Sequence, residues 1–369
     1  MAVTDDLAAD VAAVLARRSG NGADDWATPD RGLIKGGPFS TLGAARLLVE
    51  LGVDPADPML AATIDLIWSA WRADGRFRLA PSGAIYPCQT AHAACTLAHL
   101  GQADDPRLAS TFQHLLDTQF ADGGWRCNKF SYGHGPETDS SNPGPTLIAL
   151  EAFRFTAMAN NSPALDGAVD FLLSHWVSRA PLGPCHYGIG SLFLQVSYPL
   201  ADYHLFSWVQ VLSYYERARV DHRYAEALAA LEAQLVDGQV VPGRVSRAFA
   251  GLQFCRNGEP SRLATSLFRA QGTAQLASRA SCAASRTARA ASVTRGLLTR
   301  RPDGPHSAKL PLLTSLSEVI ALGASSGKPP SGRRLASSTA SASLHRGSDS
   351  RPRSAITCSA RRTSKNWIG

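Results

Sequence analysis

Apolar residues between positions 31 and 271 recur every three or four positions, which is the spacing of one face of an α-helix. In the stretch 38–51, Leu42, Ala45 and Leu48 follow this spacing, and Gly52 stands where a helix commonly ends. The strict alternation of apolar and polar residues that is typical of a half-buried strand is scarce. The pattern therefore predicts an all-α protein.

The predicted helices come in pairs that are separated by glycine-containing turns. The first helix of each pair covers 38–51, 87–100, 145–155 and 199–218, and the second covers 58–71, 106–119, 164–176 and 221–236. Gly75, Gly123 and Gly238 each follow a second helix, and Gly183 stands where the remaining turn is expected. The repeat is about 50–60 residues long, which suits helix pairs that bury their apolar faces by stacking on neighbours. We expect a repeat domain at 31–271, with the first helices as its inner layer, after a helical lead-in at 1–30.

The formal net charge is +7, but basic and acidic residues are unevenly distributed along the chain. Residues 272–369 hold 16 Lys and Arg against 3 Asp and Glu, whereas residues 1–271 hold 21 basic and 27 acidic residues. Helical spacing is lost beyond Gln271, and Trp367 is the single aromatic residue of this basic tail. Such a composition buries too little apolar surface to offset the conformational entropy of folding, so we expect a disordered tail.

A second interpretation of the tail stays open. Arg, Ala, Ser, Gly and Pro dominate residues 272–369, and these are the residues that a GC-rich coding sequence yields when it is read out of frame. The repeat region also stops in mid-cycle near Arg269, where another helix pair would be expected. The tail is therefore either a disordered basic extension or an out-of-frame translation, and a ring of stacked pairs would be incomplete.

The sequence excludes several classes of protein. The most apolar stretch, 191–212, is broken by Asp202 and His204, so no membrane span is expected. The acidic N-terminus is unlike a signal peptide, which favours a cytoplasmic protein. Seven widely spread cysteines do not form the pattern of a disulfide framework. Because the basic residues of the tail lack interleaved aromatics, we expect no specific nucleic-acid partner.

The turn after the second predicted pair carries a motif. It reads Gln119-Phe120-Ala121-Asp122-Gly123-Gly124-Trp125, with weaker copies at 73–77 and 236–240. This motif resembles the Q-x-x-D-G-x-W repeat of squalene cyclases and of the related protein prenyltransferase β subunits. The resemblance covers residues 30–270 and implies an α/α toroid, which is a ring of inner and outer helices.

The resemblance also implies two kinds of chemistry. Triterpene cyclases protonate a double bond with an acidic D-x-D-D-type motif, which this sequence lacks. Prenyltransferase β subunits hold zinc with Asp, Cys and His and bind a lipid diphosphate with Arg and Lys. Arg126 and Lys129 are similar to the diphosphate-binding stretch, and His204 stands in a segment that resembles the one with the zinc histidine. In place of the D-G-C arrangement, Asp139 stands in for the zinc aspartate and Ser141 replaces the cysteine.

Three residues of the predicted inner layer form a candidate zinc site. Cys88 begins one inner helix, Cys127 precedes another and His204 lies on a third. Inner helices that start at one mouth of a ring would bring these side chains together, and Cys/Cys/His with an open fourth position is a zinc ligand set. The alternative is that the cysteines are small buried apolar residues and His204 is a hydrogen-bonded core histidine.

A polar loop at 133–139 holds candidates for acid–base catalysis. His134 and Asp139 are residue types that transfer protons. Arg126 and Lys129, just before this loop, would bind a diphosphate through charge-assisted hydrogen bonds. The alternative for each is a solvated surface loop.

Two functions from different classes follow. The first is an enzyme-like prenyltransferase and squalene-cyclase-repeat protein that binds an isoprenoid or other apolar ligand in the toroid, with zinc as cofactor. The second is a non-catalytic toroid that serves as a binding or scaffold protein, or a truncated, frameshifted product. Convergence of Cys88, Cys127 and His204 at the inner mouth would favour the first.

Overall fold

The computed structural model describes residues 5–18, 26–35, 37–82, 84–127, 135–200 and 202–271, all of which lie in one of two compact units. The predicted tail at 272–369 lies outside these ranges, as do Lys129 and His134. Within the described ranges the chain is helical, and its strand-like contacts are isolated bridges such as that between Trp71 and Phe77. The predicted all-α class is confirmed.

The helices follow the predicted pairs. The first helices are α2 (Thr41–Glu50), α4 (Pro87–His99), α6 (Pro143–Phe153) and α9 (Leu205–Leu212). The second helices are α3 (Pro58–Ser69), α5 (Pro106–Asp117), α7 (Pro163–Ser178) and α11 (His222–Glu232). The remaining elements are α1 (Asp5–Leu15), α8 (Ser191–Leu194), α10 (Glu216–Arg219), the short 3-10 helices η1 (Gly37–Phe39), η2 (Pro136–Asp139) and η3 (Arg247–Phe249), and a helix at 262–271.

One predicted helix differs clearly from the structure. The helix expected at 199–218 is divided into α9 and α10. His204 has extended backbone and accepts a hydrogen bond from the Ser207 N–H, so it caps α9 instead of lying inside a helix. Apolar residues with helical spacing stand on both sides of His204, so the sequence pattern predicted one continuous helix there.

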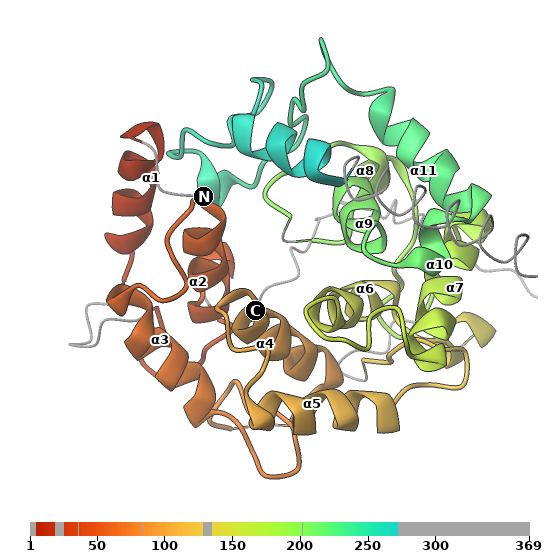
Figure 1. Cartoon of the computed structure of the whole chain (residues 1–369), viewed down its shortest axis with the longest axis horizontal. Coiled ribbons are helices and arrows are strands. Elements are labelled where there is room, and N and C mark those ends of the chain that lie inside the picture. Colours follow the sequence, from red (N-terminus) through yellow and green to blue (C-terminus); the bar gives the residue numbers. More distant parts are fainter. Residues whose placement is uncertain are drawn as a thin grey trace, which may run out of the picture. The chain divides into compact units, whose positions relative to one another are not determined.

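The two helices of each pair have different surroundings. The first helices contact one another in sequence order, α2 with α4, α4 with α6 and α6 with α9, and each second helix packs on the first helix of its own pair (Figure 1). In α4 every residue from Cys88 to Ala98 except His92 is buried, whereas the buried residues of α5 follow a single face. A helix that is buried on several sides belongs to an inner layer, and an amphipathic helix covers it.

The glycine turns at Gly75 and Gly123 pack closely against the second helix of the next pair. Gly75 and Gly123 have φ of 81° and 92°, in the left-handed region that favours glycine. A Cβ on Gly75 would lie 2.7 Å from the carbonyl oxygen of Ser110 in α5, and one on Gly123 would lie 2.5 Å from that of Gly167 in α7. These turns therefore require glycine for conformation and for close approach.

An equivalent hydrogen bond from a backbone N–H to a side chain occurs after Gly75, Gly123 and Gly238. The residue two positions after the glycine is buried, and its N–H donates to a threonine hydroxyl on the next first helix. The pairs are Phe77 to Thr90 (3.3 Å), Trp125 to Thr146 (3.0 Å) and Val240 to Thr265 (3.0 Å). The internal repeat predicted from the glycine spacing is thus present in the structure, and the helix at 262–271 begins a fifth cycle.

The two ends of the described chain contact each other. The Asp10 carboxylate of α1 accepts hydrogen bonds from the N–H groups of Gln253 (2.8 Å) and Phe254 (2.9 Å). The rings of Phe39 and Phe249 pack edge to face, 5.4 Å apart. The first and last described cycles are therefore joined. None of the helices in the described ranges combines the length and hydropathy that a bilayer crossing requires.

Candidate metal site

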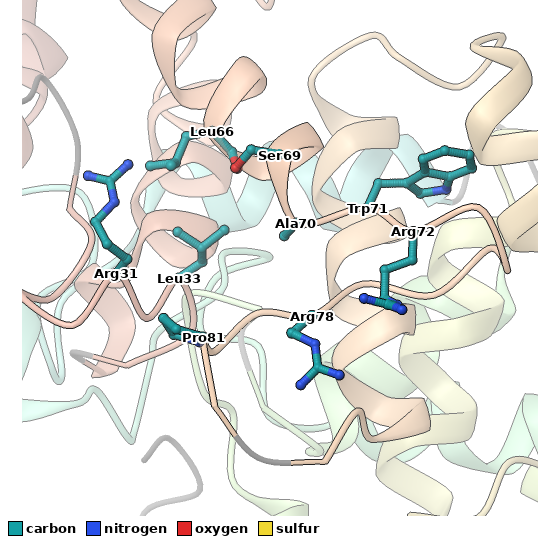
Figure 2. Close-up of a pocket in the computed structure, with 9 residues that line it drawn as sticks. All are labelled: Arg31, Leu33, Leu66, Ser69, Ala70, Trp71, Arg72, Arg78 and Pro81. Atoms are coloured by element: carbon teal, nitrogen blue, oxygen red, sulfur yellow. The ribbon is translucent and has the colours of Figure 1, made fainter.

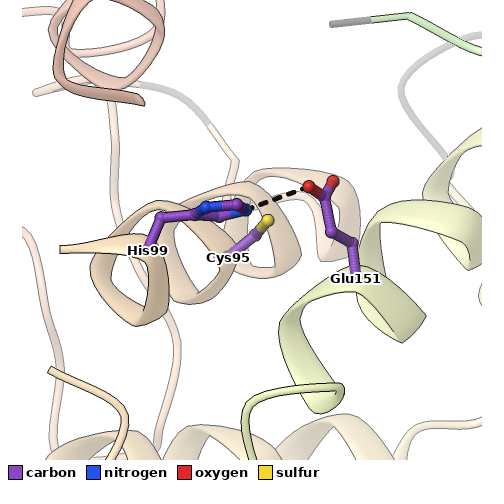
Figure 3. Close-up of side chains that lie close together, drawn as sticks. All are labelled: Cys95, His99 and Glu151. Atoms are coloured by element: carbon purple, nitrogen blue, oxygen red, sulfur yellow. Dashed lines mark hydrogen bonds and ion pairs between the residues drawn. The ribbon is translucent and has the colours of Figure 1, made fainter. Parts of the chain in front are cut away.

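Helices α4 and α6 bring three side chains with metal-ligand atoms together. Cys95 and His99 are four residues apart and so share one face of α4, while Glu151 approaches from α6 (Figure 3). The Cys95 Sγ, a ring nitrogen of His99 and a carboxylate oxygen of Glu151 all lie within 4.8 Å of one another. Among the described residues this is the one group of His, Cys, Asp and Glu that meets this distance.

Glu151 is the electrostatic centre of this group. Its Oε1 accepts hydrogen bonds from Arg46 of α2 at 2.7 Å and from His99 Nε2 at 3.0 Å. Burial acts to raise the pKa of Glu151, but Arg46 and His99 outweigh it and hold that pKa below its usual range. Burial lowers the pKa of His99 to about 4. At neutral pH the site therefore holds a carboxylate, a neutral imidazole that donates through Nε2, and a guanidinium.

The thiol of Cys95 completes the group. Burial is the main cause that raises its pKa; Arg46 opposes this shift and Glu151 adds to it. Cys95 is therefore a neutral thiol at neutral pH, and a bound metal ion would deprotonate it. Burial and the charge of Arg46 also lower the pKa of His92, one turn earlier on α4, to about 4.

The residue types suit zinc. Zn²⁺ takes sulfur, imidazole nitrogen and carboxylate oxygen as ligands, and catalytic zinc sites use three protein ligands with one position open. Zinc would take the place of the proton that His99 shares with Glu151, and His99 would then carry its proton on Nδ1. Arg46 would remain as the second partner of Glu151 and hold the carboxylate in position.

A small cavity lies between Glu151 and α9. It measures about 20 Å³, room for one water molecule, and its polar lining includes Arg46, Glu151, Asp202 and Gln210. Burial raises the pKa of Asp202 above its usual range, although Arg244 opposes this shift. Polar groups from α2, α6 and α9 thus surround one small space beside the candidate ligands.

Two of the three residues predicted as zinc ligands are in contact. The Sγ atoms of Cys88 and Cys127 lie 3.2 Å apart, and Cys185 joins them in a buried cluster. The hydrogen bond to Cys127, together with burial, raises the pKa of Cys88. Cys88 stands at the start of α4, at the opposite end from His99.

His204 has a different environment. Its Nδ1 accepts from the Ser207 N–H at 3.3 Å, and its Nε2 lies 2.9 Å from the Ser207 hydroxyl. Burial lowers its pKa to about 3. The described residues place no group of ligand atoms within 4.8 Å of one another that includes His204.

The other predicted site residues lie near η2 or outside the described ranges. Arg126 and Asp139 form an ion pair at 3.5 Å, and the Asp139 side chain is 81% exposed. Lys129 and His134 belong to the stretch 128–134, which the structure does not describe. Arg126 and Asp139 thus form a surface pair.

The sequence did contain a signal for the Cys95–His99–Glu151 group. Cys95 and His99 have the i,i+4 spacing of one helical face, and Glu151 interrupts an apolar run on the next predicted inner helix. An ionisable residue on a buried helix requires a partner. The sequence pattern does not reveal how α4 and α6 are rotated relative to each other. This rotation decides whether the side chains of Cys95 and His99 face the side chain of Glu151.

The chain was also compared with known proteins. It matches no protein-family model and no curated protein sequence. The candidate metal site therefore rests on the geometry of the described residues.

Proposed function

We propose that this protein is a zinc-binding α/α toroid of the prenyltransferase and squalene cyclase type, with its metal at Cys95, His99 and Glu151. The observation that carries the proposal is the proximity of these three ligand atoms on successive first helices, within 4.8 Å of one another. The resemblance of the turn at 119–125 and the contact between the two ends of the described chain support the toroid.

The proposed activity is enzyme-like and directed at an isoprenoid or other apolar ligand. A zinc ion with an open position activates a bound thiol or water, or polarises a bound substrate. In this chain Arg46 orients the Glu151 carboxylate, and His99 stays neutral and ready to bind through nitrogen because its pKa is low. The small cavity beside Glu151 has room for one water molecule next to that candidate ligand.

The test is the zinc affinity of the full chain and of single variants. We expect about one zinc per chain, and a loss of affinity of more than roughly 10–100-fold in Cys95→Ala and Glu151→Gln, because even outer partners of a ligand cost that much. Cys88→Ala is the matched control, since it removes a buried thiol from the other end of α4. Equal zinc affinity in Cys95→Ala and the native chain, or loss in Cys88→Ala alone, would contradict the proposal.

Cobalt substitution provides a spectroscopic check for a thiolate ligand in chains that are shown to be folded. A Co²⁺-loaded chain with a thiolate ligand shows sulfur-to-metal charge-transfer absorption. We expect this absorption in the native chain and in Cys88→Ala, and none in Cys95→Ala. Once the metal is established, binding of farnesyl diphosphate to the zinc-loaded and the metal-free chain tests the ligand class.

One observation favours a second function, a non-catalytic scaffold. Glu151 already accepts hydrogen bonds from Arg46 and His99, so the group is a satisfied polar network without a metal. Under this alternative the native chain binds no zinc at micromolar concentration, and Glu151→Gln changes stability alone.

A further inference from the structure

Two buried thiols from different parts of the second helix pair lie in contact. Cys88 belongs to the first turn of α4, and Cys127 follows the glycine turn after α5. Their Sγ atoms are 3.2 Å apart. A disulfide bond is about 2.05 Å long, so the two sulfur atoms need to approach by only about 1 Å to form one. We call Cys88 and Cys127 the thiol pair.

Ordered backbone holds both members of the thiol pair in place. The Gln89 N–H donates to the Tyr86 carbonyl at 3.0 Å and closes the first turn of α4 around Cys88. The Cys127 N–H donates to the side-chain oxygen of Asn142, the residue before α6, at 3.1 Å. Because the fold already holds the two sulfur atoms together, a bond between them orders little additional chain.

The thiol pair has little contact with solvent. Cys88 is 6% exposed and Cys127 is 0% exposed. Neither of them lines the small cavity beside Glu151 or the larger cavity, of about 280 Å³, between residues 31–33, the end of α3 and the turn at 70–81 (Figure 2). A reagent that reaches these thiols must therefore be small. Hydrogen peroxide is little larger than water, and it oxidises thiols by two electrons.

A third cysteine, Cys185, packs against the thiol pair in the same buried cluster. The three Sγ atoms are not among the groups of ligand atoms that lie within 4.8 Å of one another in the described part of the chain. A metal centre made of thiolates requires all three sulfur atoms at one point, whereas a disulfide requires two. The geometry therefore favours a bond between Cys88 and Cys127 over a metal centre.

We propose that Cys88 and Cys127 form a disulfide when the chain meets hydrogen peroxide. The sulfur of Cys88, the more exposed of the two, attacks one peroxide oxygen; the O–O bond breaks, one water leaves, and Cys88 becomes a sulfenic acid. The Cys127 sulfur then attacks the Cys88 sulfur, the S–O bond breaks and a second water leaves. The two thiols lose two electrons and two protons, and one peroxide becomes two water molecules. This reaction uses none of the proposed zinc ligands.

The surroundings of Cys88 make the bond slow to form and slow to reduce. The hydrogen bond with Cys127, together with burial, raises the pKa of Cys88. The thiolate is the nucleophile, so the first attack is slow at neutral pH. A disulfide is easily reduced where the protein stabilises the reduced form as a thiolate, and a raised pKa is the opposite of that condition.

The disulfide would close one complete helix pair into a loop. Cys88 and Cys127 are 39 positions apart, and α4 and α5 lie between them. A cross-link of this length stabilises a protein chiefly by restricting its unfolded chain. We therefore expect the oxidised chain to have a Tm roughly 5–10 °C above that of the reduced chain.

The test is peptide mapping of the full chain after treatment with hydrogen peroxide in the presence of a chelator. We expect Cys88 and Cys127 to be recovered as one linked pair that dithiothreitol separates. Glutathione in a parallel sample shows when the oxidant has acted. A bond between Cys127 and Cys185, sulfinic acid at Cys88, or two free thiols after the glutathione is consumed would each overturn the proposal.

Single variants separate the thiol pair from the other buried cysteines. Cys127→Ser should show neither the linked pair nor the shift in Tm. Cys255→Ser replaces a buried cysteine outside this cluster and is the matched control, which should keep both. Cys185→Ser should also keep both, and loss of the bond in this variant would overturn the assignment to Cys88 and Cys127. The same shift in Tm in peroxide-treated Cys127→Ser would overturn the closure of the helix pair.

Discussion

Helix α4 carries sulfur near both ends, in two different chemical environments. At its start, Cys88 contacts Cys127 and Cys185, and partly buried tyrosine rings pack around these thiols. Toward its end, Cys95 lies beside His99 and Glu151, with Arg46 on the far side of the carboxylate. The first group is thiol-only, and the second combines a thiol, an imidazole and a carboxylate.

This difference decides at which end of α4 a metal ion can bind with fewer proton losses. In the thiol-only group, burial and the neighbouring thiol raise the pKa of Cys88, so each ligand would have to lose a proton in apolar surroundings. In the second group Glu151 is already ionised and His99 already neutral. Only Cys95 must lose its proton, so metal binding at neutral pH costs less at this end.

The largest effect that separates the two ends is expected from Glu151→Gln. Arg46 would lose the carboxylate that accepts its hydrogen bond, while its side chain stays only 19% exposed. Removal of one member of a buried ion pair leaves an uncompensated charge, and we expect the free energy of unfolding to fall by about 3 kcal/mol. Urea denaturation of the metal-free chain measures this. Glu232→Gln on the exposed end of α11 is the control, with an expected change below about 0.5 kcal/mol. Equal effects in the two variants would show that Glu151 does not hold a buried charge.

A smaller effect, counted per pH unit, is expected from a change of pH. The pKa of His99 is lowered from 6.5 to about 4 in the folded chain, so between these values the unfolded chain binds a proton that the folded chain does not. Stability is then lost as the pH falls from 6.5 toward 4, by about 1.4 kcal/mol per pH unit for each such histidine. His92, with the same shift, adds to the slope.

His99→Gln should remove one histidine's share of this slope. The measurement is urea denaturation between about pH 7 and pH 4.5 with a chelator present, which separates proton binding from metal binding. His222→Gln is the control, because the His222 side chain is 80% exposed. The same slope in His99→Gln and in the native chain would mean that His99 is protonated in the folded protein.

The smallest effect is expected at the thiol-only end. Cys88→Ala removes one buried sulfur from an uncharged group, and we expect the free energy of unfolding to fall by about 1 kcal/mol. Thermal denaturation with and without zinc measures this. A change that is several times larger in zinc than in chelator would show that Cys88 binds metal, and would reverse the comparison between the two ends of α4.

Much of the fold could be predicted because it depends on local patterns. The helix pairs follow from apolar spacing, and the turns follow from glycines such as Gly75 and Gly123, whose positive φ and close backbone contacts exclude a side chain. These features need no knowledge of how one helix is rotated against the next.

The contacts between residues of the candidate site depend on how neighbouring helices are rotated relative to one another, which the sequence does not show. His204 was predicted inside a helix and expected beside the cysteines, but it caps α9 and bonds to Ser207. Cys95, His99 and Glu151 belong to helices that were both predicted, yet no spacing within either helix reveals that their ligand atoms meet.

Four features follow from local patterns in the amino-acid sequence: the all-α class, the order of the helix pairs, the repeat and the position of the glycine turns. Each of these depends on spacing within a few residues or on the conformational freedom of glycine. Tertiary structure alone decided which polar side chains of the first helices share a space. The close packing of α2, α4 and α6 orients Arg46, Cys95 and Glu151 toward one another, and the need of a buried carboxylate for a positively charged partner stabilises that orientation.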